Sequence, residues 1–282
     1  MPTAIVIDST ASLPEAFPGD LPLTVVPAIL NWNGTSYRDG LDITATAFYE
    51  RLRIDPVHPT TSQVPPGSFG ETFERLLAAG FDVLTLVVSS RISGTYQSAQ
   101  IARDDLPGSN IVVLDSLSSG MGLGWAAITA ARAAKDGADL DACRVFAEKA
   151  LEHIGVVGTV NTLKYLHRSG RIGGASRFLG SALDLKPVLE LRDGLIDGVD
   201  RVRTRRKAIA RMLDLLEERI AGRSPVRLAV MHANDPDTAD RLLELVSDRF
   251  EPVETAVSIF SPILGAAFGE GTVGVCYIAG IE

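Results

Sequence analysis

Short apolar segments alternate with amphipathic segments along almost the whole chain. The apolar segments predict strands at positions 4–8, 21–30, 81–89, 110–115, 154–160, 187–191, 194–199, 226–232, 252–260 and 271–279. Patterns with helical spacing lie between them, at positions 45–53, 67–79, 94–103, 120–135, 140–153, 204–220 and 238–249. This alternation predicts an α/β protein with largely parallel sheets flanked by helices.

No linker rich in Pro, Gly or Ser interrupts the alternation. We expect two α/β lobes, an N-terminal lobe over residues 1–153 and a C-terminal lobe over residues 154–282. A chain of 282 residues is long enough to bury a large core. The two lobes are therefore expected to pack closely within one unit.

The sharpest boundary is a hydroxyl-rich turn at positions 89–95, between a buried strand and a helix. The start of a helix presents free backbone N–H groups and the positive end of the helix dipole. Gly94 permits a close backbone approach, and ligands of α/β sheets usually sit at strand ends. We expect Ser93, Gly94 and Thr95 to bind an anion. Simple capping of the helix is the alternative.

A second polar turn, at positions 60–69, precedes the next helix pattern upstream. Thr61 or Ser62 is expected to add hydroxyl donors to a small anion. Capping of the following helix is again the alternative.

Two basic segments are candidates for charge neutralisation. Arg171 lies in a glycine-rich loop at positions 170–174, which lacks the spacing of a nucleotide-binding loop. Positions 201–207 are strongly basic, and strand alternation would place Arg201, Arg203 and Arg205 on one face. Of these we favour Arg203 for forked hydrogen bonds to a carboxylate or phosphate. A solvated helix start is the alternative.

Composition narrows the function. The formal charge of −8 argues against a general nucleic-acid binder. The four histidines and two cysteines show no metal-ligand spacing, and no serine-hydrolase motif is present, so no metal and no cofactor are expected. The chain enters its first strand without a basic, apolar leader, and no run approaches the ~18 apolar residues of a spanning helix. We expect a cytoplasmic protein without stable membrane insertion.

Taken together, the motifs resemble the DegV family of bacterial fatty-acid-binding proteins. The resemblance runs nearly end to end, and its most specific parts are Ser93-Gly94-Thr95-Tyr96-Gln97-Ser98-Ala99 and Gly170-Arg171-Ile172-Gly173. Weaker matches lie at positions 5–13, 37–40, 61–67, 115–116, 121–124, 165–166, 186–187 and 202–205.

The resemblance implies a two-lobed DegV-type fold with one long-chain fatty acid, such as palmitate (hexadecanoate), enclosed between the lobes. It implies that the carboxylate meets the hydroxyl groups of Thr61 and Ser93 and the N–H groups around Gly94. Arg171 and Arg203 match the family's arginines near that head group. The family's role is lipid binding rather than catalysis: the bound acid is presented to a separate ATP-dependent fatty acid kinase.

One departure from the family pattern stands near the C-terminus. Ala267 occupies the place of a histidine that the family commonly carries in a glycine-rich loop. Acid binding is expected to survive, because the other head-group residues remain. The replacement of the histidine by Ala267 puts in question whether the carboxylate is handed on to the kinase for phosphorylation.

Elementary energetics permit the implied ligand. Burying a chain of about 16 carbons gains on the order of 10 kcal/mol, at about 0.8 kcal/mol per methylene. Three or four charge-assisted hydrogen bonds, at roughly 1.5–3 kcal/mol each, offset the burial of the carboxylate. An aliphatic helix at positions 179–189 is a candidate lining for the tail.

Two other functions stay open. One is a stand-alone phosphotransferase or other small-anion enzyme that holds phosphate with the loop at 170–174. The other is a regulator that contacts nucleic acid through positions 201–207, and its binding would depend strongly on salt.

Overall fold

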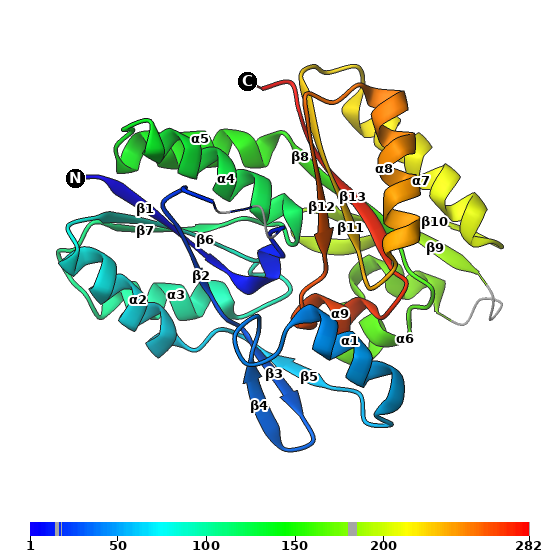
Figure 1. Cartoon of the computed structure of the whole chain (residues 1–282), viewed down its shortest axis with the longest axis horizontal. Helices are drawn as coiled ribbons and strands as arrows, with labels where there is room; N and C mark the ends of the chain where they lie inside the picture. The colour runs from blue at the N-terminus through cyan, green and yellow to red at the C-terminus, as the bar shows by residue number, and fades with distance from the viewer. Residues whose placement is uncertain (15–16, 18, 180–184, 282) are drawn as a thin grey trace.

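The computed structural model describes residues 1–14, 17, 19–179 and 185–281. Two sheets with their helices lie side by side, and a smaller third sheet lies beneath their junction (Figure 1). The α/β class and the two-lobed arrangement are those predicted.

The first sheet is fully parallel. Its strand order is β2 (Leu23–Val26), β1 (Thr3–Asp8), β6 (Asp82–Val87) and β7 (Ile111–Asp115). One face is covered by α2 (Pro66–Ala78) and α3 (Thr95–Asp104), and the other by α4 (Met121–Lys135) and α5 (Leu140–Glu152) (Figure 1). Every residue of β1 and β6 is buried, because a central parallel strand is covered on both faces.

The second sheet is mixed. Its strand order is β10 (Leu195–Val202), β9 (Lys186–Arg192), β8 (Ile154–Thr159), β13 (Val273–Ala279), β11 (Val226–His232) and β12 (Glu254–Ile259). The predicted parallel pairing holds for β11 and β12, whereas the other neighbours are antiparallel. Asp193 and Gly194, both at positive φ, form the two-residue turn of a β9–β10 hairpin. Such a tight connection makes antiparallel pairing obligatory.

The third sheet is small, antiparallel and not predicted. Its order is β4 (Thr35–Arg38), β3 (Ile29–Trp32) and β5 (Thr60–Ser62), with α1 (Ala45–Ile54) beside it. The predicted strand at 21–30 is divided at Pro27 and Ala28, so that β2 and β3 belong to different sheets. Proline has no N–H to donate to a ladder, and here the chain leaves one sheet for another.

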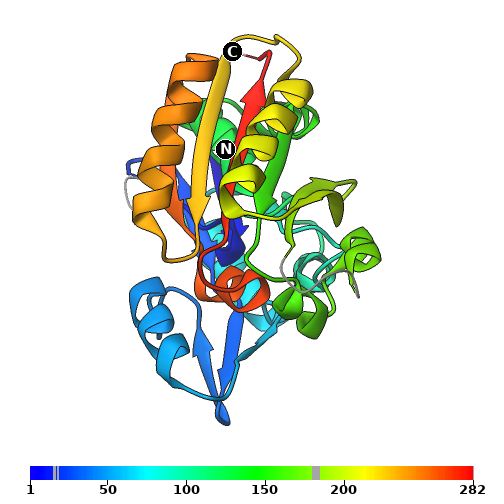
Figure 2. The same cartoon turned by 90° about the vertical axis from the view of Figure 1, so that its right-hand side faces the viewer.

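Four short elements complete the junction of the two lobes. They are η1 (Ser9–Ala11), α6 (Lys164–Ser169), η2 (Gly173–Phe178) and α9 (Pro262–Phe268). Both α6 and α9 lie between the second sheet and the third (Figure 2). The sequence pattern did not predict α6 and α9, because helices of six or seven residues are too short to show a clear period.

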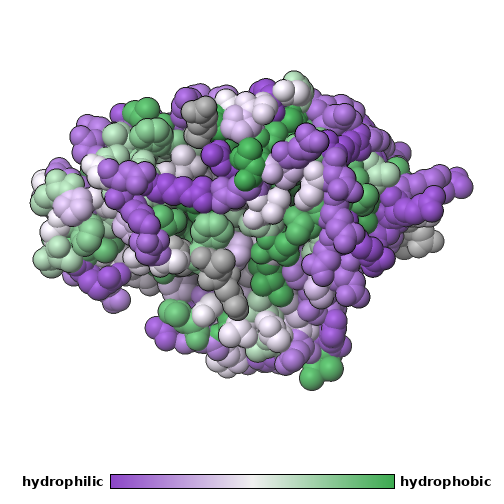
Figure 3. Space-filling view, turned by 45° about the horizontal axis from the view of Figure 1, so that its top comes forward, coloured by the Kyte–Doolittle hydropathy of each residue, from purple (hydrophilic) through white to green (hydrophobic). Residues whose placement is uncertain are grey.

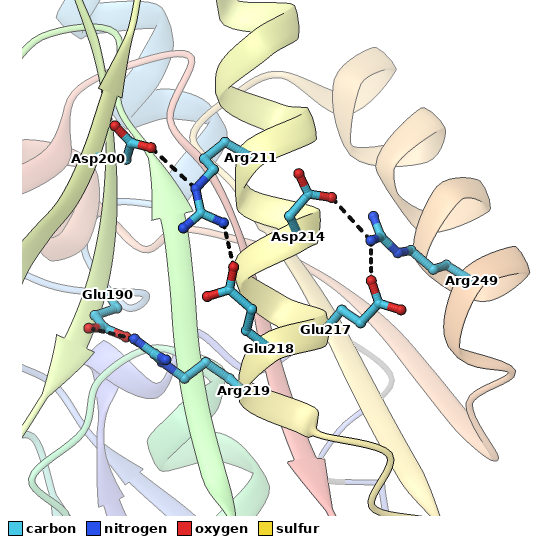
Figure 4. A network of polar contacts seen from close by, with 8 residues as sticks. All are labelled: Glu190, Asp200, Arg211, Asp214, Glu217, Glu218, Arg219 and Arg249. Atoms are coloured by element: carbon cyan, nitrogen blue, oxygen red, sulfur yellow. Dashed lines mark hydrogen bonds and ion pairs between the residues drawn. The ribbon is translucent and has the colours of Figure 1, made fainter.

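The outer face of the second sheet is covered by α7 (Arg205–Ile220) and α8 (Pro236–Phe250) (Figure 2). Ion pairs connect these layers, as Figure 4 shows. Arg219 of α7 pairs with the buried Glu190 of β9, at 2.9 Å from Nε to Oε2. Arg249 of α8 pairs with Asp214 of α7 at 3.1 Å.

The largest hydrophobic core crosses the boundary predicted at residue 153. It joins Ile5, Leu84 and Trp125 of the first lobe to Met231 and Cys276 of the second sheet. The two lobes therefore share one interior, as the absence of a linker indicated. The exact division into domains stays a prediction.

The surface mixes polar and apolar residues. On the face drawn in Figure 3, hydrophobic residues gather near the centre and hydrophilic residues predominate around them. Across the described ranges, no helix is both long and apolar enough to span a membrane.

Candidate functional site

The polar turn between β6 and α3 is held in shape by its own hydrogen bonds. The backbone N–H groups of Ile92 and Ser93 both donate to the Ser89 carbonyl oxygen, at 3.1 Å each. The Ser93 hydroxyl accepts from the Thr95 N–H at 3.2 Å and lies 2.9 Å from the Thr95 hydroxyl. Ser93 therefore stabilises the turn just before α3, whose N-cap is Gly94, and the Ser93 hydroxyl oxygen has capacity for a further partner.

A neighbouring polar side chain lies very close to the backbone at position 94. A Cβ built there would overlap Oε1 of Gln63, whose Nε2 donates to the Ser98 hydroxyl at 2.8 Å. The missing side chain lets the two polar segments of the chain meet. Within the described residues, the Gly94 N–H has no acceptor, which leaves it available to a ligand.

β5 brings Thr61 and Ser62 to the same place. This edge strand pairs with β3, and Thr61 lies opposite Leu30. The helix that follows, α2, is preceded by Pro65 and has no side-chain cap, so the capping alternative for this segment is wrong. The Ser62 hydroxyl accepts from Asn31 Nδ2 at 2.9 Å. The Thr61 hydroxyl has no hydrogen bond to any described residue.

These segments line a cavity of about 590 Å³, which we call the head-group cavity. Five of the seven residues predicted for the site line it, and these are Thr61, Ser62, Ser93, Thr95 and Arg171. Gly94 lies in the chain between two of them. Ala267 of α9 also faces this cavity.

Arg171 connects the second lobe to the turn of the first. It follows the left-handed Gly170 that ends α6. Its Nε donates to the Ile92 carbonyl oxygen at 3.1 Å, and its Nη1 donates to the Ser169 carbonyl oxygen. Both of these partners are neutral, and no described acidic side chain pairs with the Arg171 guanidinium beside the head-group cavity.

Thr10 and Ser119 also line the head-group cavity, and sequence reasoning did not assign them to it. Both side chains are at least nine-tenths buried, and neither hydroxyl has a hydrogen-bond partner among the described residues. A buried unsatisfied hydroxyl group is costly, so both are poised for a polar ligand. Their positions could have indicated this role. Thr10 follows the end of β1 and Ser119 follows the end of β7, at the edge of a parallel sheet where ligands bind.

A second cavity, of about 570 Å³, lies behind the first, and we call it the tail cavity. The two cavities share part of their walls, namely Ile92, Ser119, Ile196, Leu264 and Phe268. The rest of the tail cavity is mostly aliphatic, with Val156, Val160, Leu189, Leu191 and Met231 among its walls.

Of the segment predicted to line a tail, positions 180–184 lie outside the described residues. Leu189 does line the tail cavity, from strand β9 rather than from a helix.

The tail cavity owes part of its space to glycine. Gly158 of β8 and Gly274 of β13 are paired across the sheet and both line it. A Cβ at Gly274 would lie 2.9 Å from the Val157 carbonyl oxygen, and one at Gly158 would lie 3.1 Å from that of Val273. Sequence reasoning missed this pair, because an isolated glycine in a strand carries no signal of what it faces.

Arg203 is exposed, between β10 and α7, and lines neither cavity. Arg205, two residues on, is the one that turns inward: its Nη2 lies 2.6 Å from Asp235 Oδ2 and its Nη1 lies 2.9 Å from Asn161 Oδ1. For Arg203, its exposure favours the alternative of a solvated helix start. Contact between Arg203 and a ligand stays a prediction.

The glycines of the loop at 170–174 are explained by packing. A Cβ at Gly173 would overlap the Ile196 carbonyl oxygen, and one at Gly174 would overlap Oδ1 of Asp197. Both glycines let η2 lie against β10, so this loop gives no support to a phosphate cradle. The described residues also hold no cluster of three or more His, Cys, Asp and Glu side chains suited to a metal ion.

Comparison with known proteins gives a consistent result. A family model described as "Uncharacterised protein, DegV family" matches residues 2–280. A DegV domain-containing protein of Halalkalibacterium halodurans is 36% identical, over 97% of this chain and 97% of its own.

Two solved structures are similar over nearly their whole length. One is described as showing fatty acid binding of a DegV family protein from Thermus thermophilus; its TM-score is 0.92 at 33% identity, covering 99% of this chain and 100% of that chain. The other is DegV, a fatty acid binding protein from Bacillus subtilis, with a TM-score of 0.89, 33% identity and 99% of each chain covered. With its family model matched almost end to end, the chain belongs to the DegV family.

Proposed function

We propose that this protein binds one long-chain fatty acid, with its carboxylate in the head-group cavity and its alkyl chain in the tail cavity. The observation that carries the proposal is that the two cavities are adjacent and have five lining residues in common. A polar cavity with free donors shares a wall with an apolar one, which matches a molecule that has one anionic end and one apolar end.

Several hydrogen-bond donors in and beside the wall of the head-group cavity are available to a carboxylate. Among the described residues, the hydroxyl groups of Thr10 and Ser119 have no partner, and the Thr61 hydroxyl and the Gly94 N–H make no hydrogen bond. Arg171 adds a positive charge. Several hydrogen bonds to a charged group, at roughly 1.5–3 kcal/mol each, offset the cost of burying a carboxylate.

The tail supplies the driving force. At about 0.8 kcal/mol per methylene, a palmitate chain gains on the order of 10 kcal/mol on leaving water, before association entropy is subtracted. Fatty-acid binding named for the Thermus thermophilus and Bacillus subtilis structures supports the same ligand class. We propose a binding role without catalysis, in which the acid is presented in the cytoplasm to a separate ATP-dependent kinase. This last step rests on family resemblance.

Extraction under denaturing conditions tests the binding function. Purified protein, denatured and extracted into organic solvent, should release a long-chain acid detectable by mass spectrometry. Native mass spectrometry of the intact complex should show one acid per chain. A protein that carries no acid, and takes up none after delipidation and incubation with hexadecanoate, would contradict the proposal.

A further inference from the structure

A buried carboxyl group lies next to the wall of the head-group cavity. Asp39 follows β4, and its backbone N–H donates to the carbonyl oxygen of Ala28, a lining residue, at 3.0 Å. Asp39 is 3% exposed, and within the described chain neither of its carboxyl oxygens has a hydrogen-bond partner of ordinary geometry. The charge that acts on this group is that of Asp8, and no described cation offsets it. Burial of such a group favours its protonated form.

Two hydroxyl groups beside Asp39 belong to segments that build the head-group cavity. Ser9 begins η1, and its hydroxyl accepts from the Ala28 N–H at 3.1 Å, so its own hydrogen is available to Asp39. The next residue, Thr10, lines the cavity. Ser261 is the N-cap residue of α9, yet its hydroxyl does not cap the helix and lies beside Asp39. The carboxyl group of Asp39 therefore adjoins both the turn that carries Thr10 and the start of α9.

The position of α9 matters to the whole ligand site. Leu264 and Phe268 of this helix line both cavities, and Ala267 lines the head-group cavity. The start of the helix is fixed by the Ser261 N–H, which donates to the Ser12 hydroxyl at 3.0 Å. A change of charge beside Ser261 can therefore reach the ligand through the cavity walls.

Of the two buried acids, Asp39 is the one that holds a proton. Burial raises the pKa of both. The Asp8 carboxylate is stabilised by two backbone donors, the Thr10 N–H at 2.9 Å and the Val88 N–H at 2.6 Å. Among the described residues Asp39 has no such donor, and burial raises its pKa to about 7. Asp39 therefore exchanges its proton near neutral pH.

The other titratable or charged groups around Asp39 keep their charge near neutral pH. Tyr49 of α1 stays a neutral donor, because burial raises its pKa. Arg38 and Asp42, close to Asp39 in sequence, are exposed and form an ion pair at 2.8 Å. His58, which contacts α9, has its pKa lowered by burial. Asp39 is thus the group at this site whose charge changes between about pH 6.5 and 8.5.

We propose that Asp39 is a positioning residue of the fatty-acid site, and that it takes up a proton from solvent when the acid binds. The inference rests on the proposed function, because the ligand carboxylate near Thr10 supplies the negative charge that favours the proton. The protonated carboxyl group bonds the Ser9 and Ser261 hydroxyl groups and so fixes the turn and α9. Since linkage is reciprocal, loss of the proton at higher pH weakens binding of the acid.

Calorimetric titration of the delipidated full-length protein at pH 6.5, 7.5 and 8.5 tests the coupling, with hexadecanoate supplied from cyclodextrin. Across this range the wild type should lose about fivefold in affinity relative to Asp39→Asn, which keeps a neutral donor at the site. At pH 7.5 the wild type should take up about half a proton per acid, measured as a difference in binding enthalpy between HEPES and Tris buffers. Asp39→Asn should lack this uptake.

Asp42→Asn is the matched control, because it makes the same change at an exposed residue three positions away. It should keep the wild-type pH profile and proton uptake. The ionisation of hexadecanoate itself is common to all three proteins and cancels in their comparison.

A pH profile and a proton uptake shared by wild type and Asp39→Asn would overturn the inference and leave the proposed function intact. A loss of affinity in Asp39→Asn by the same factor at every pH would also overturn it, since the residue would then be merely structural. Absence of hexadecanoate binding by the wild type at every pH would overturn both. Should Asp39→Asn fail to fold, carbon-13 NMR of the wild-type aspartate carboxyl groups decides: the pKa of Asp39 should rise on adding hexadecanoate, and an unchanged pKa would overturn the inference.

Discussion

Gly158 and Gly274 are direct partners in the antiparallel β8–β13 pair, and together they leave room for the tail cavity. Two glycines in register give a patch of sheet without side chains, over which other groups or a ligand can lie against the backbone. The absence of side chains at Gly158 and Gly274 thus shapes the inner face of the second sheet.

Gly158→Val is expected to block the tail cavity. Its Cβ would lie 3.1 Å from the Val273 carbonyl oxygen, so that the paired strand must shift by a few tenths of an ångström, and its methyl groups would occupy cavity space. Hexadecanoate affinity should fall at least about tenfold, the cost of roughly two excluded methylenes, as measured by calorimetric titration. Decanoate, with a shorter chain, should lose less. Gly67→Ala, where an added Cβ meets no atom within 4 Å, is the control.

Thr10→Val tests the buried hydroxyl groups. The substitution removes a donor from the head-group cavity at nearly constant volume, so hexadecanoate affinity should fall by roughly 0.5–1.5 kcal/mol. The lipid-free protein should keep or gain thermal stability, because an unsatisfied buried hydroxyl disappears. The matched control is Thr85→Val, which removes a buried hydroxyl that likewise has no partner among the described residues but does not line the cavity. Equal affinity losses in the two variants would remove Thr10 from the site.

The double variant Thr61→Ala with Ser93→Ala should weaken hexadecanoate at least about tenfold, or about 1.4 kcal/mol. Both hydroxyl groups line the head-group cavity, from β5 and from the turn before α3. Ser90→Ala, in the same turn but exposed and outside the lining, provides the comparison. Unchanged affinity in the double variant would show that the carboxylate lies elsewhere.

Much of this site follows from the sequence, and the missing parts have physical causes. The turn at Ser93 was predictable because a buried strand ends there and a helix starts at once. Thr10 and Ser119 were not assigned because they follow β1 and β7, two strands distant in sequence that only the folded sheet brings to one edge, with β6 between them. Arg203 was favoured from strand alternation, but the strand ends at Val202 and the alternation ends with it.

The third sheet shows the same limit. Its hairpin signal, Asn33-Gly34, is present in the sequence, and both residues adopt the positive φ that such a turn requires. The strands are so short that the apolar pattern alone merged β3 with β2. Thr61 therefore comes from an edge strand that the pattern did not reveal.

Asp39→Asn tests a buried acid near the junction of the lobes. Burial raises the pKa of Asp39 to about 7, against the lowering effect of the Ser9 and Ser261 hydroxyl groups. The unfolded chain ionises near 3.8, so below that pH both states are protonated. As pH rises from about 3.8 towards 7, the unfolded state has lost the proton that the folded state keeps, so the folded state loses stability by at most about 1.4 kcal/mol per pH unit, and the loss is complete above pH 7.

Asparagine removes this dependence. Relative to wild type, the free energy of unfolding of Asp39→Asn should therefore increase between pH 5 and pH 8, by about 2 kcal/mol. Urea titrations measure this difference. Asp42→Asn is the control, since the exposed Asp42 has its pKa lowered to about 2 by hydrogen bonds from Arg38 and stays ionised throughout. Parallel pH profiles for wild type and Asp39→Asn would contradict the assignment.

Arg219→Leu should cost stability. Glu190 is 7% exposed and receives two hydrogen bonds from Arg219, so removing the arginine leaves a buried carboxylate with Arg192 as its remaining ion-pair partner (Figure 4). The expected loss is roughly 1.5–3 kcal/mol. Arg249→Leu should cost under about 0.5 kcal/mol, because its partners Asp214 and Glu217 are mostly exposed. Equal losses in urea unfolding would contradict the distinction.

A crystal structure of the delipidated protein with added hexadecanoate tests the central claim most directly. The account predicts one acid per chain, with its carboxylate within hydrogen-bond distance of Thr61 or Ser93 and its alkyl chain over Gly158 and Gly274. An acid bound on the surface, or both cavities left without acid at saturating hexadecanoate, would contradict it.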